Sequence, residues 1–135
     1  MLLVEDDETY RYLAEKTFAK TQVPSRLQVA ATGGEALRLL DQAMHDGIRL
    51  PQLILLDLKL PGTNGFEIIQ YLHNNNLPIP VVVLSSSDAP EDIHRSYELK
   101  AAAYVQKPSG AREFREFVDS LLHFWQRHVH FPDDV

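Results

Sequence analysis

Two short runs in the middle of the chain are apolar at every position, "LILL" at Leu53–Leu56 and "VVVL" at Val81–Leu84. A strand with one face in water alternates polar and apolar residues, so fully apolar runs are typical of strands covered on both faces. Such strands are usually parallel and are joined by crossover helices. We therefore predict a parallel sheet between two layers of helices.

The rest of the chain repeats the same alternation of strand and helix. Three further strands are predicted at Leu2–Val4, Leu27–Ala31 and Ala102–Val105. Helices are predicted where apolar residues recur every three or four positions. These stripes run over Tyr10–Phe18, Ala36–Met44, Phe66–Leu72, Ile93–Tyr97 and Phe114–Trp125, and the last helix extends past what a core needs. Five such units predict a flavodoxin-like, doubly wound α/β fold with a five-stranded parallel sheet, five helices and an extended C-terminal helix.

Length and charge narrow the class of protein. A chain of 135 residues suits one domain. It has no cysteine, which fits a reducing cytoplasm, and no apolar run near the ~20 residues of a membrane span. A net charge of −6 disfavours binding to a phosphate backbone. We expect a cytoplasmic protein that binds neither nucleic acid nor membrane.

Polar side chains follow four of the predicted strands. "EDD" at Glu5–Asp7 follows the first strand, Asp57 the third and Ser85 the fourth, and Lys107 comes shortly after the fifth. Alone, each acid or serine is commonly a turn residue or a helix cap, and a lone lysine before proline is usually a surface residue. However, the carboxyl ends of parallel strands meet at one edge of the sheet, so the four groups are expected to lie together. Clustered carboxylates suit Mg²⁺, and an aspartate can act as a nucleophile, so the pattern predicts a phosphoryl group held on Asp57.

The segments "LLVEDD", "LILLDLKLPGTNGFE", "PVVVLSSS" and "AYVQKP" follow one another along the chain. With them the chain resembles the receiver domain of two-component response regulators, with 1–122 as the domain and 123–135 as an extension. The resemblance implies that Asp57 accepts a phosphoryl group from a histidine kinase. It also implies that Mg²⁺ is held by Asp6, Asp7, Asp57 and the Lys59 backbone carbonyl. Such a protein is a signalling phosphoacceptor that catalyses only its own phosphorylation and slow dephosphorylation.

The same resemblance implies roles for residues on the last two strands. Lys107, Ser85 and Ser86 would bind the phosphoryl group, and Ser85 and Tyr104 would form the switch. The alternative for Tyr104 is a purely structural role, as a strand tyrosine with a buried ring and a solvated hydroxyl. Receivers of this kind also imply a cis peptide bond between Lys107 and Pro108.

A narrower resemblance concerns the C-terminal third. "SSSDAPEDIHRSYELKAAAYVQKP" followed by "FVDSLLHFW" is similar to single-domain receivers paired with phytochrome-type histidine kinases. It implies a homodimer built on the fourth helix, fifth strand, fifth helix and the extension. Phe124, Trp125 and Phe131 are the expected interface residues, since extra aromatics outside a core usually mark an interface. The alternative is a terminal segment that folds back on its own domain.

Two other functions use similar parts. Phosphatases of the haloacid dehalogenase type need a second aspartate two residues after the nucleophile, where this chain has Lys59. Their remaining acids follow the lysine, whereas Asp6 and Asp7 precede it. A phosphorylation-independent interaction module of the same fold would usually lack the acceptor, an acid or the lysine. A receiver is the function that the sequence favours.

Overall fold

The structure is a computed structural model that describes residues 1–21 and 26–130. Strands and helices alternate along the chain, as predicted. The strands are β1 (Leu2–Val4), β2 (Gln28–Ala30), β3 (Ile54–Asp57), β4 (Val81–Ser85) and β5 (Ala103–Gln106). The helices are α1 (Glu8–Lys20), α2 (Gly33–His45), α3 (Gly65–Asn74), α4 (Pro90–Glu98) and α5 (Ala111–His128).

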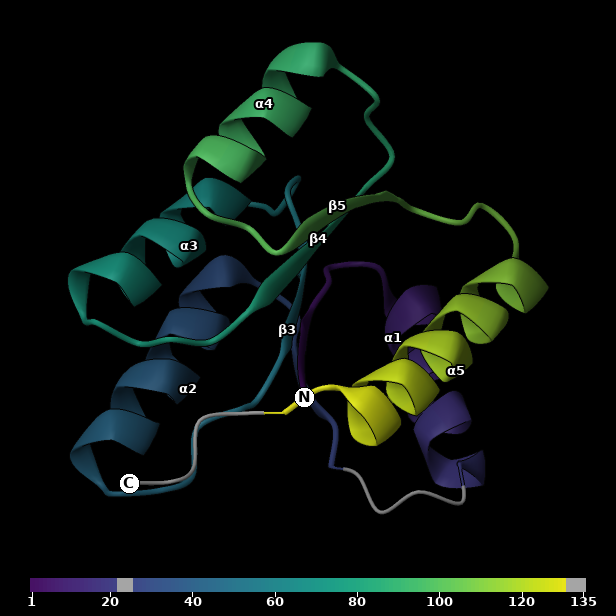
Figure 1. Cartoon of the computed structure of the whole chain (residues 1–135), viewed down its shortest axis with the longest axis horizontal. Coiled ribbons are helices and arrows are strands. Elements are labelled where there is room, and N and C mark those ends of the chain that lie inside the picture. The colour runs from purple at the N-terminus through teal and green to yellow at the C-terminus, as the bar shows by residue number, and fades with distance from the viewer. Residues whose placement is uncertain (22–25, 131–135) are drawn as a thin grey trace.

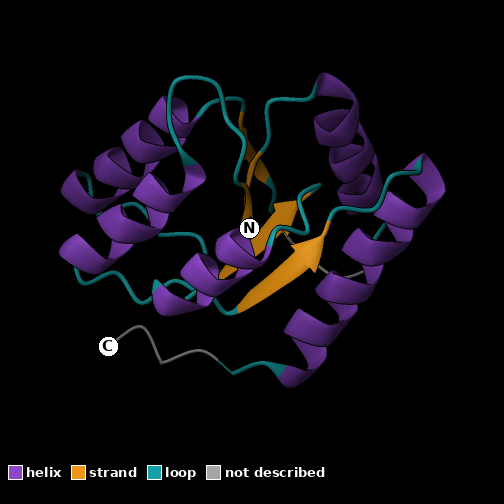
Figure 2. Ribbon diagram, turned by 90° about the horizontal axis from the view of Figure 1, so that it is seen from above, coloured by secondary structure: helices purple, strands orange, loops and turns teal. Residues whose placement is uncertain are grey.

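The strands form one parallel sheet in the order β2-β1-β3-β4-β5. Helices α1 and α5 cover one face, and α2, α3 and α4 lie on the other (Figure 1). Seen from above, the sheet lies between these two layers (Figure 2). This is the predicted doubly wound fold, in which β1 and β3 lie side by side at the centre with their carboxyl ends at the same edge.

The core consists of two apolar clusters, one on each face of the sheet. Ile54 and Leu56 of β3 pack toward α2 and α3, whereas Leu55 packs toward α1 and α5. Each cluster removes a full layer of side chains from water, which is the main favourable contribution to folding. The run Leu53–Leu56 is therefore apolar at every position because both faces of β3 are buried, as predicted from the sequence.

Two residues on the predicted helix stripes are exposed. Met44 is 36% exposed and Tyr97 is 49% exposed, while their neighbours Ala43 and Ser96 are buried. Small side chains therefore occupy the buried side of α2 and α4 at these positions. The Tyr97 hydroxyl instead accepts a hydrogen bond from the backbone N–H of Tyr104, at 3.1 Å on the edge strand β5.

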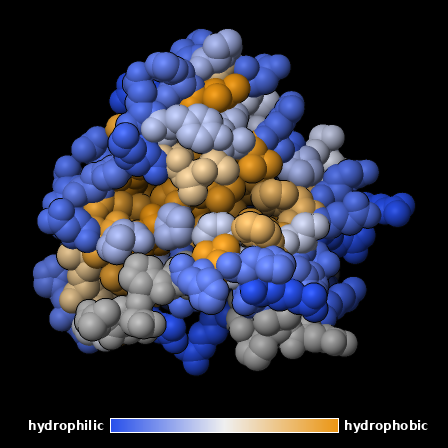
Figure 3. Space-filling model, in the orientation of Figure 1, coloured by the Kyte–Doolittle hydropathy of each residue, from blue (hydrophilic) through white to orange (hydrophobic). Residues whose placement is uncertain are grey.

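Figure 3 shows the hydropathy of one face of the molecule. On the face shown in Figure 3, apolar residues gather toward the centre between the helices, and hydrophilic residues cover the outer sides. Among the described residues, no helix has both the length and the apolar character to cross a membrane.

Candidate functional site

Asp57 is the last residue of β3 and is 8% exposed. Its Oδ1 accepts a hydrogen bond from the Lys59 backbone N–H at 3.0 Å. Helix α3 begins close by, at Gly65, where an added Cβ would lie 2.9 Å from the Asp57 carbonyl oxygen and from the Leu58 Cα. A glycine is required at this position because the backbone of α3 meets the backbone of the acceptor loop.

Two acids at the end of β1 lie beside Asp57. Carboxylate oxygens of Glu5, Asp6 and Asp57 all lie within 4.8 Å of one another. The pairing of Val4 with Leu56 places Glu5 directly beside Asp57 on the neighbouring strand. Glu5 is buried and Asp6 is exposed. These oxygens form a cluster that can hold a divalent cation, since hard oxygen ligands suit such ions.

Asp7 has a different position from the one that the predicted metal set implies. Its Oδ1 accepts a hydrogen bond from the Thr9 backbone N–H at 2.8 Å, so Asp7 caps α1. Glu5, which was absent from that set, takes its place in the carboxylate cluster. The sequence carried a signal for this, since Glu5 follows its strand directly, just as Asp57 ends its own.

Lys107 completes the site from the loop after β5. Its ammonium contacts Glu5 Oε1 and lies 3.4 Å from Asp57 Oδ2, and its side chain is only 7% exposed. The Lys107 backbone N–H donates to the Ser85 carbonyl at 2.8 Å, which continues the pairing of β4 with β5. The sheet itself therefore fixes the point from which the lysine reaches Asp57.

Burial and neighbouring charges together shift the pKa values of Glu5 and Lys107. Burial raises the pKa of Glu5 to about 7; Asp57 adds to the rise and Lys107 opposes it. Burial lowers the pKa of Lys107, but its hydrogen bonds and charge interactions with Glu5 and Asp57 together outweigh burial, and the net pKa is raised. The lysine therefore stays positively charged within the cluster.

The predicted switch residues meet through the backbone of Ser87. Ser85 is fully buried, and its hydroxyl accepts a hydrogen bond from the Ser87 N–H at 3.1 Å. The Tyr104 hydroxyl donates to the Ser87 carbonyl at 2.7 Å. Ser86 is exposed. The loop after β4 thus links the predicted switch hydroxyl to the predicted switch ring.

The prediction of a cis bond between Lys107 and Pro108 is wrong. The structure has this bond in trans, the form that most X–Pro bonds favour.

Of the predicted interface residues, Phe124 is 55% exposed and Trp125 is half-buried against the core. Their rings pack edge to face at 6.4 Å. Phe131 lies outside the described residues.

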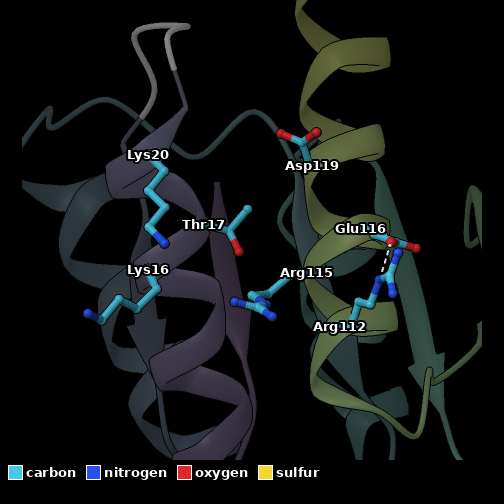
Figure 4. Close-up of a pocket in the computed structure, with 7 residues that line it drawn as sticks. All are labelled: Lys16, Thr17, Lys20, Arg112, Arg115, Glu116 and Asp119. Atoms are coloured by element: carbon cyan, nitrogen blue, oxygen red, sulfur yellow. Dashed lines mark hydrogen bonds and ion pairs between the residues drawn. The ribbon is translucent and has the colours of Figure 1, made fainter.

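A separate cleft of about 320 Å³ lies between α1 and α5 (Figure 4). Its lining mixes cations with acids, and Arg112 pairs with Glu116 at 3.1 Å. None of the predicted site residues lines it.

Comparison with known families decides what kind of protein carries this site. The model of the response regulator receiver domain matches residues 1–119. The chain belongs to the response regulator receiver family. This receiver is therefore a protein of phosphorylation-based two-component signalling rather than a conventional enzyme.

Its relatives include other regulatory proteins. The receiver is 31% identical to Response regulator Rcp1 of Synechocystis, over 98% of this chain and 92% of that protein. It is 30% identical to the probable methanogenesis regulatory protein FilR2 of Methanothrix harundinacea, over 93% and 82%.

Solved structures agree with this assignment. The Mn²⁺-bound form of Rcp1 matches with a TM-score of 0.86 and 32% identity, over 97% of this chain and 96% of that one. The phosphorylated cyanobacterial phytochrome response regulator RcpA matches with a TM-score of 0.88 and 32% identity, over 98% and 96%.

Proposed function

We propose that Asp57 is the phosphoacceptor and that it takes its phosphoryl group from a phosphohistidine on a histidine kinase. The observation that carries this proposal is the surroundings of its carboxylate. One Asp57 oxygen accepts a hydrogen bond from a backbone N–H, and the other faces the Lys107 ammonium. The carboxylates of Glu5 and Asp6 lie beside it. An aspartate placed among groups that neutralise an incoming phosphate is suited to nucleophilic attack on phosphorus.

The proposed metal is Mg²⁺, held by Glu5, Asp6 and Asp57 with the Lys59 carbonyl. Three clustered carboxylates and the absence of any sulfur or imidazole ligand among them favour a hard cation. When bound, the cation neutralises charge between the carboxylates and the phosphoryl oxygens. A solved structure of the relative Rcp1 holds Mn²⁺, which supports a divalent cation as a ligand of this receiver. In this proposal Glu5 takes the place of Asp7 among the ligands, because Glu5 lies in the carboxylate cluster and Asp7 caps α1.

The chain's own residues then have separate roles in transfer. An Asp57 oxygen attacks phosphorus, the new P–O bond forms as the P–N bond breaks, and the bonding electrons leave with the histidine imidazole. Lys107 offsets the charge of the phosphoryl oxygens, and the Ser85 hydroxyl donates to one of them, with Ser86 beside it. Hydrolysis of the acyl phosphate by the receiver itself is proposed to be slow.

Phosphorylation is proposed to change the surface of α4, β5 and α5. A Ser85 hydroxyl that turned toward a phosphoryl group would no longer hold the Ser87 N–H, and Tyr104 hydrogen-bonds that same residue. The likeness to RcpA supports a phytochrome-type kinase in the cytoplasm as the partner. Residues 1–122 are proposed as the receiver unit and 123–135 as an extension that supports a homodimer. Phe124, Trp125 and Phe131 form the proposed contact.

The test is Mg²⁺-dependent phosphorylation by acetyl phosphate, measured by intact mass. Wild type is expected to gain one phosphoryl group with Mg²⁺ and none after chelation, and Asp57→Asn is expected to gain none. Asp6→Asn should weaken Mg²⁺ binding far more than the matched Asp7→Asn, which removes a charge but keeps an oxygen that can cap α1. If wild type gains no phosphoryl group under any condition, the phosphorylation-independent module becomes the better account.

A further inference from the structure

Tyr10 contacts the site from α1, and the proposed chemistry gives it no role. Its ring lies beneath the Lys107 ammonium, with Nζ 4.0 Å from the ring centroid. Its hydroxyl donates to the Pro108 carbonyl at 3.1 Å. Its ring also meets Phe114 of α5 edge to face, at 4.8 Å between centroids and an interplanar angle of 72°. One side chain thus joins α1, the loop after β5 and α5.

The Lys107 ammonium is enclosed by three groups. The carboxylates of Glu5 and Asp57 lie on one side, and the face of Tyr10 lies on another. A lysine side chain has four rotatable bonds, and ordering it costs conformational entropy. The negative face of an aromatic ring attracts a cation, and the attraction is stronger where water is excluded, as at this 7%-exposed side chain.

The ring is itself held in place at both ends. The hydroxyl is tied to the residue that follows Lys107 in the chain, and the ring edge is braced by the fully buried Phe114. A ring fixed in this way restricts where the ammonium can go, which a solvent-exposed ring would not do.

We propose that Tyr10 is a positioning residue that holds the Lys107 ammonium toward Asp57 and so speeds phosphorylation and tightens binding of a phosphoryl group. The inference rests on the proposed function of Asp57 and Lys107, and it assigns a role to a residue that the helix periodicity placed only on a packing face. Tyr10 acts through Lys107 and touches no reacting atom.

The chain supplies a matched control on the same helix. Lys16 lies over the Tyr12 ring at 5.4 Å, and Tyr12 is 55% exposed. This pair has the same chemistry but lies away from the predicted site residues. Tyr12→Leu therefore tests whether the loss of any cation–ring contact on α1 disturbs the site.

The experiment compares wild type, Tyr10→Leu, Tyr10→Phe and Tyr12→Leu. Two readouts are taken: the rate of phosphorylation by acetyl phosphate at saturating Mg²⁺, and the affinity for beryllofluoride, a phosphoryl mimic, by ¹⁹F NMR. Loss of a desolvated cation–ring contact predicts a decrease of roughly 2- to 30-fold in both for Tyr10→Leu. Tyr10→Phe keeps the ring and should restore most of the rate, and Tyr12→Leu should match wild type.

Affinity for Mg²⁺ alone separates positioning from general damage. The contacts of Tyr10 are with Lys107, Pro108 and Phe114, and the proposed metal ligands are other residues. Tyr10→Leu should therefore bind Mg²⁺ as wild type does while binding beryllofluoride more weakly. Equal weakening of both, or wild-type values for both, would overturn the proposal. If Tyr10→Leu does not fold, Tyr10→Met, which fills the same space without a ring, takes its place with the same expected results.

Failure of this inference differs from failure of the proposed function. If wild type is phosphorylated on Asp57 and Tyr10→Leu keeps the wild-type rate and mimic affinity, only the role of Tyr10 is refuted. If wild type itself accepts no phosphoryl group and binds no beryllofluoride, the proposed function is refuted first.

Discussion

Removal of the Lys107 ammonium should destabilise the metal-free protein and leave its buried acid without a partner. In Lys107→Met the methionine fills similar space, but Glu5, with a side chain only 2% exposed, loses its cation. Loss of one partner from a buried ion pair costs about 3–5 kcal/mol. Because Glu5 has a pKa raised to about 7, it can relieve part of this cost by taking up a proton.

We therefore expect the low end of that range, about 3 kcal/mol at pH 8, and a smaller loss at pH 6. For a chain of this size, the loss of about 3 kcal/mol at pH 8 corresponds to a decrease in Tm of about 10 °C. Chelator must be present, since a bound cation would compensate the acids.

The assay is urea unfolding followed by circular dichroism at both pH values. The double variant Glu5→Gln with Lys107→Met should recover at least about 1 kcal/mol relative to Lys107→Met alone, because the unpaired charge is gone. Lys16→Met, at an exposed lysine, should stay within about 0.5 kcal/mol of wild type. A Lys107→Met protein as stable as wild type at pH 8, or a double variant no better than the single one, would refute the reasoning.

Three further predictions concern the metal, the acceptor loop and the C-terminal helix. With the pKa of Glu5 near 7, Mg²⁺ affinity measured by calorimetry should weaken about tenfold from pH 8 to pH 6. The metal-free protein should become more stable as the pH falls from about 7 toward 4.5. Mg²⁺ affinity and stability that both stay constant with pH would contradict the raised pKa. Gly65→Ala should cost at least about 1 kcal/mol and slow phosphorylation of Asp57, because its Cβ meets backbone. Gly34→Ala, whose Cβ meets nothing within 4 Å, is its control, and equal stabilities would refute the steric argument. Phe124→Ser should lower the molar mass by light scattering without lowering Tm, and equal masses at every concentration would remove Phe124 from the interface.

The fold was predictable because its pattern is local. Strands buried on both faces, as in β3 and β4, are apolar throughout, and the helix stripes repeat with a period that sequence shows directly. The departures at Met44 and Tyr97 depend on small neighbours that take the buried side of each helix and, for Tyr97, on a hydrogen bond to an edge strand. Neither property is visible in periodicity.

The site was predictable to the level of the strand ends but not of each carboxylate. Asp57 and Lys107 come together as expected because sheet register fixes both. Whether Glu5 or Asp7 faces the site depends on where β1 ends and α1 begins. A shift of this boundary by one residue decides which acid lies in the cluster and which caps the helix. Tyr10 could not be found from the sequence because its contacts join residues 98 and 104 positions away.

The central claim is that a phosphoryl group is carried by Asp57 and by no other residue. The most direct measurement is borohydride reduction of the phosphorylated protein, which converts an aspartyl phosphate to homoserine, followed by sequencing of the peptides by tandem mass spectrometry. We predict homoserine at position 57 alone, only after treatment with acetyl phosphate and Mg²⁺. Homoserine at another acid, or none at position 57 in a protein whose mass shows phosphorylation, would contradict the account.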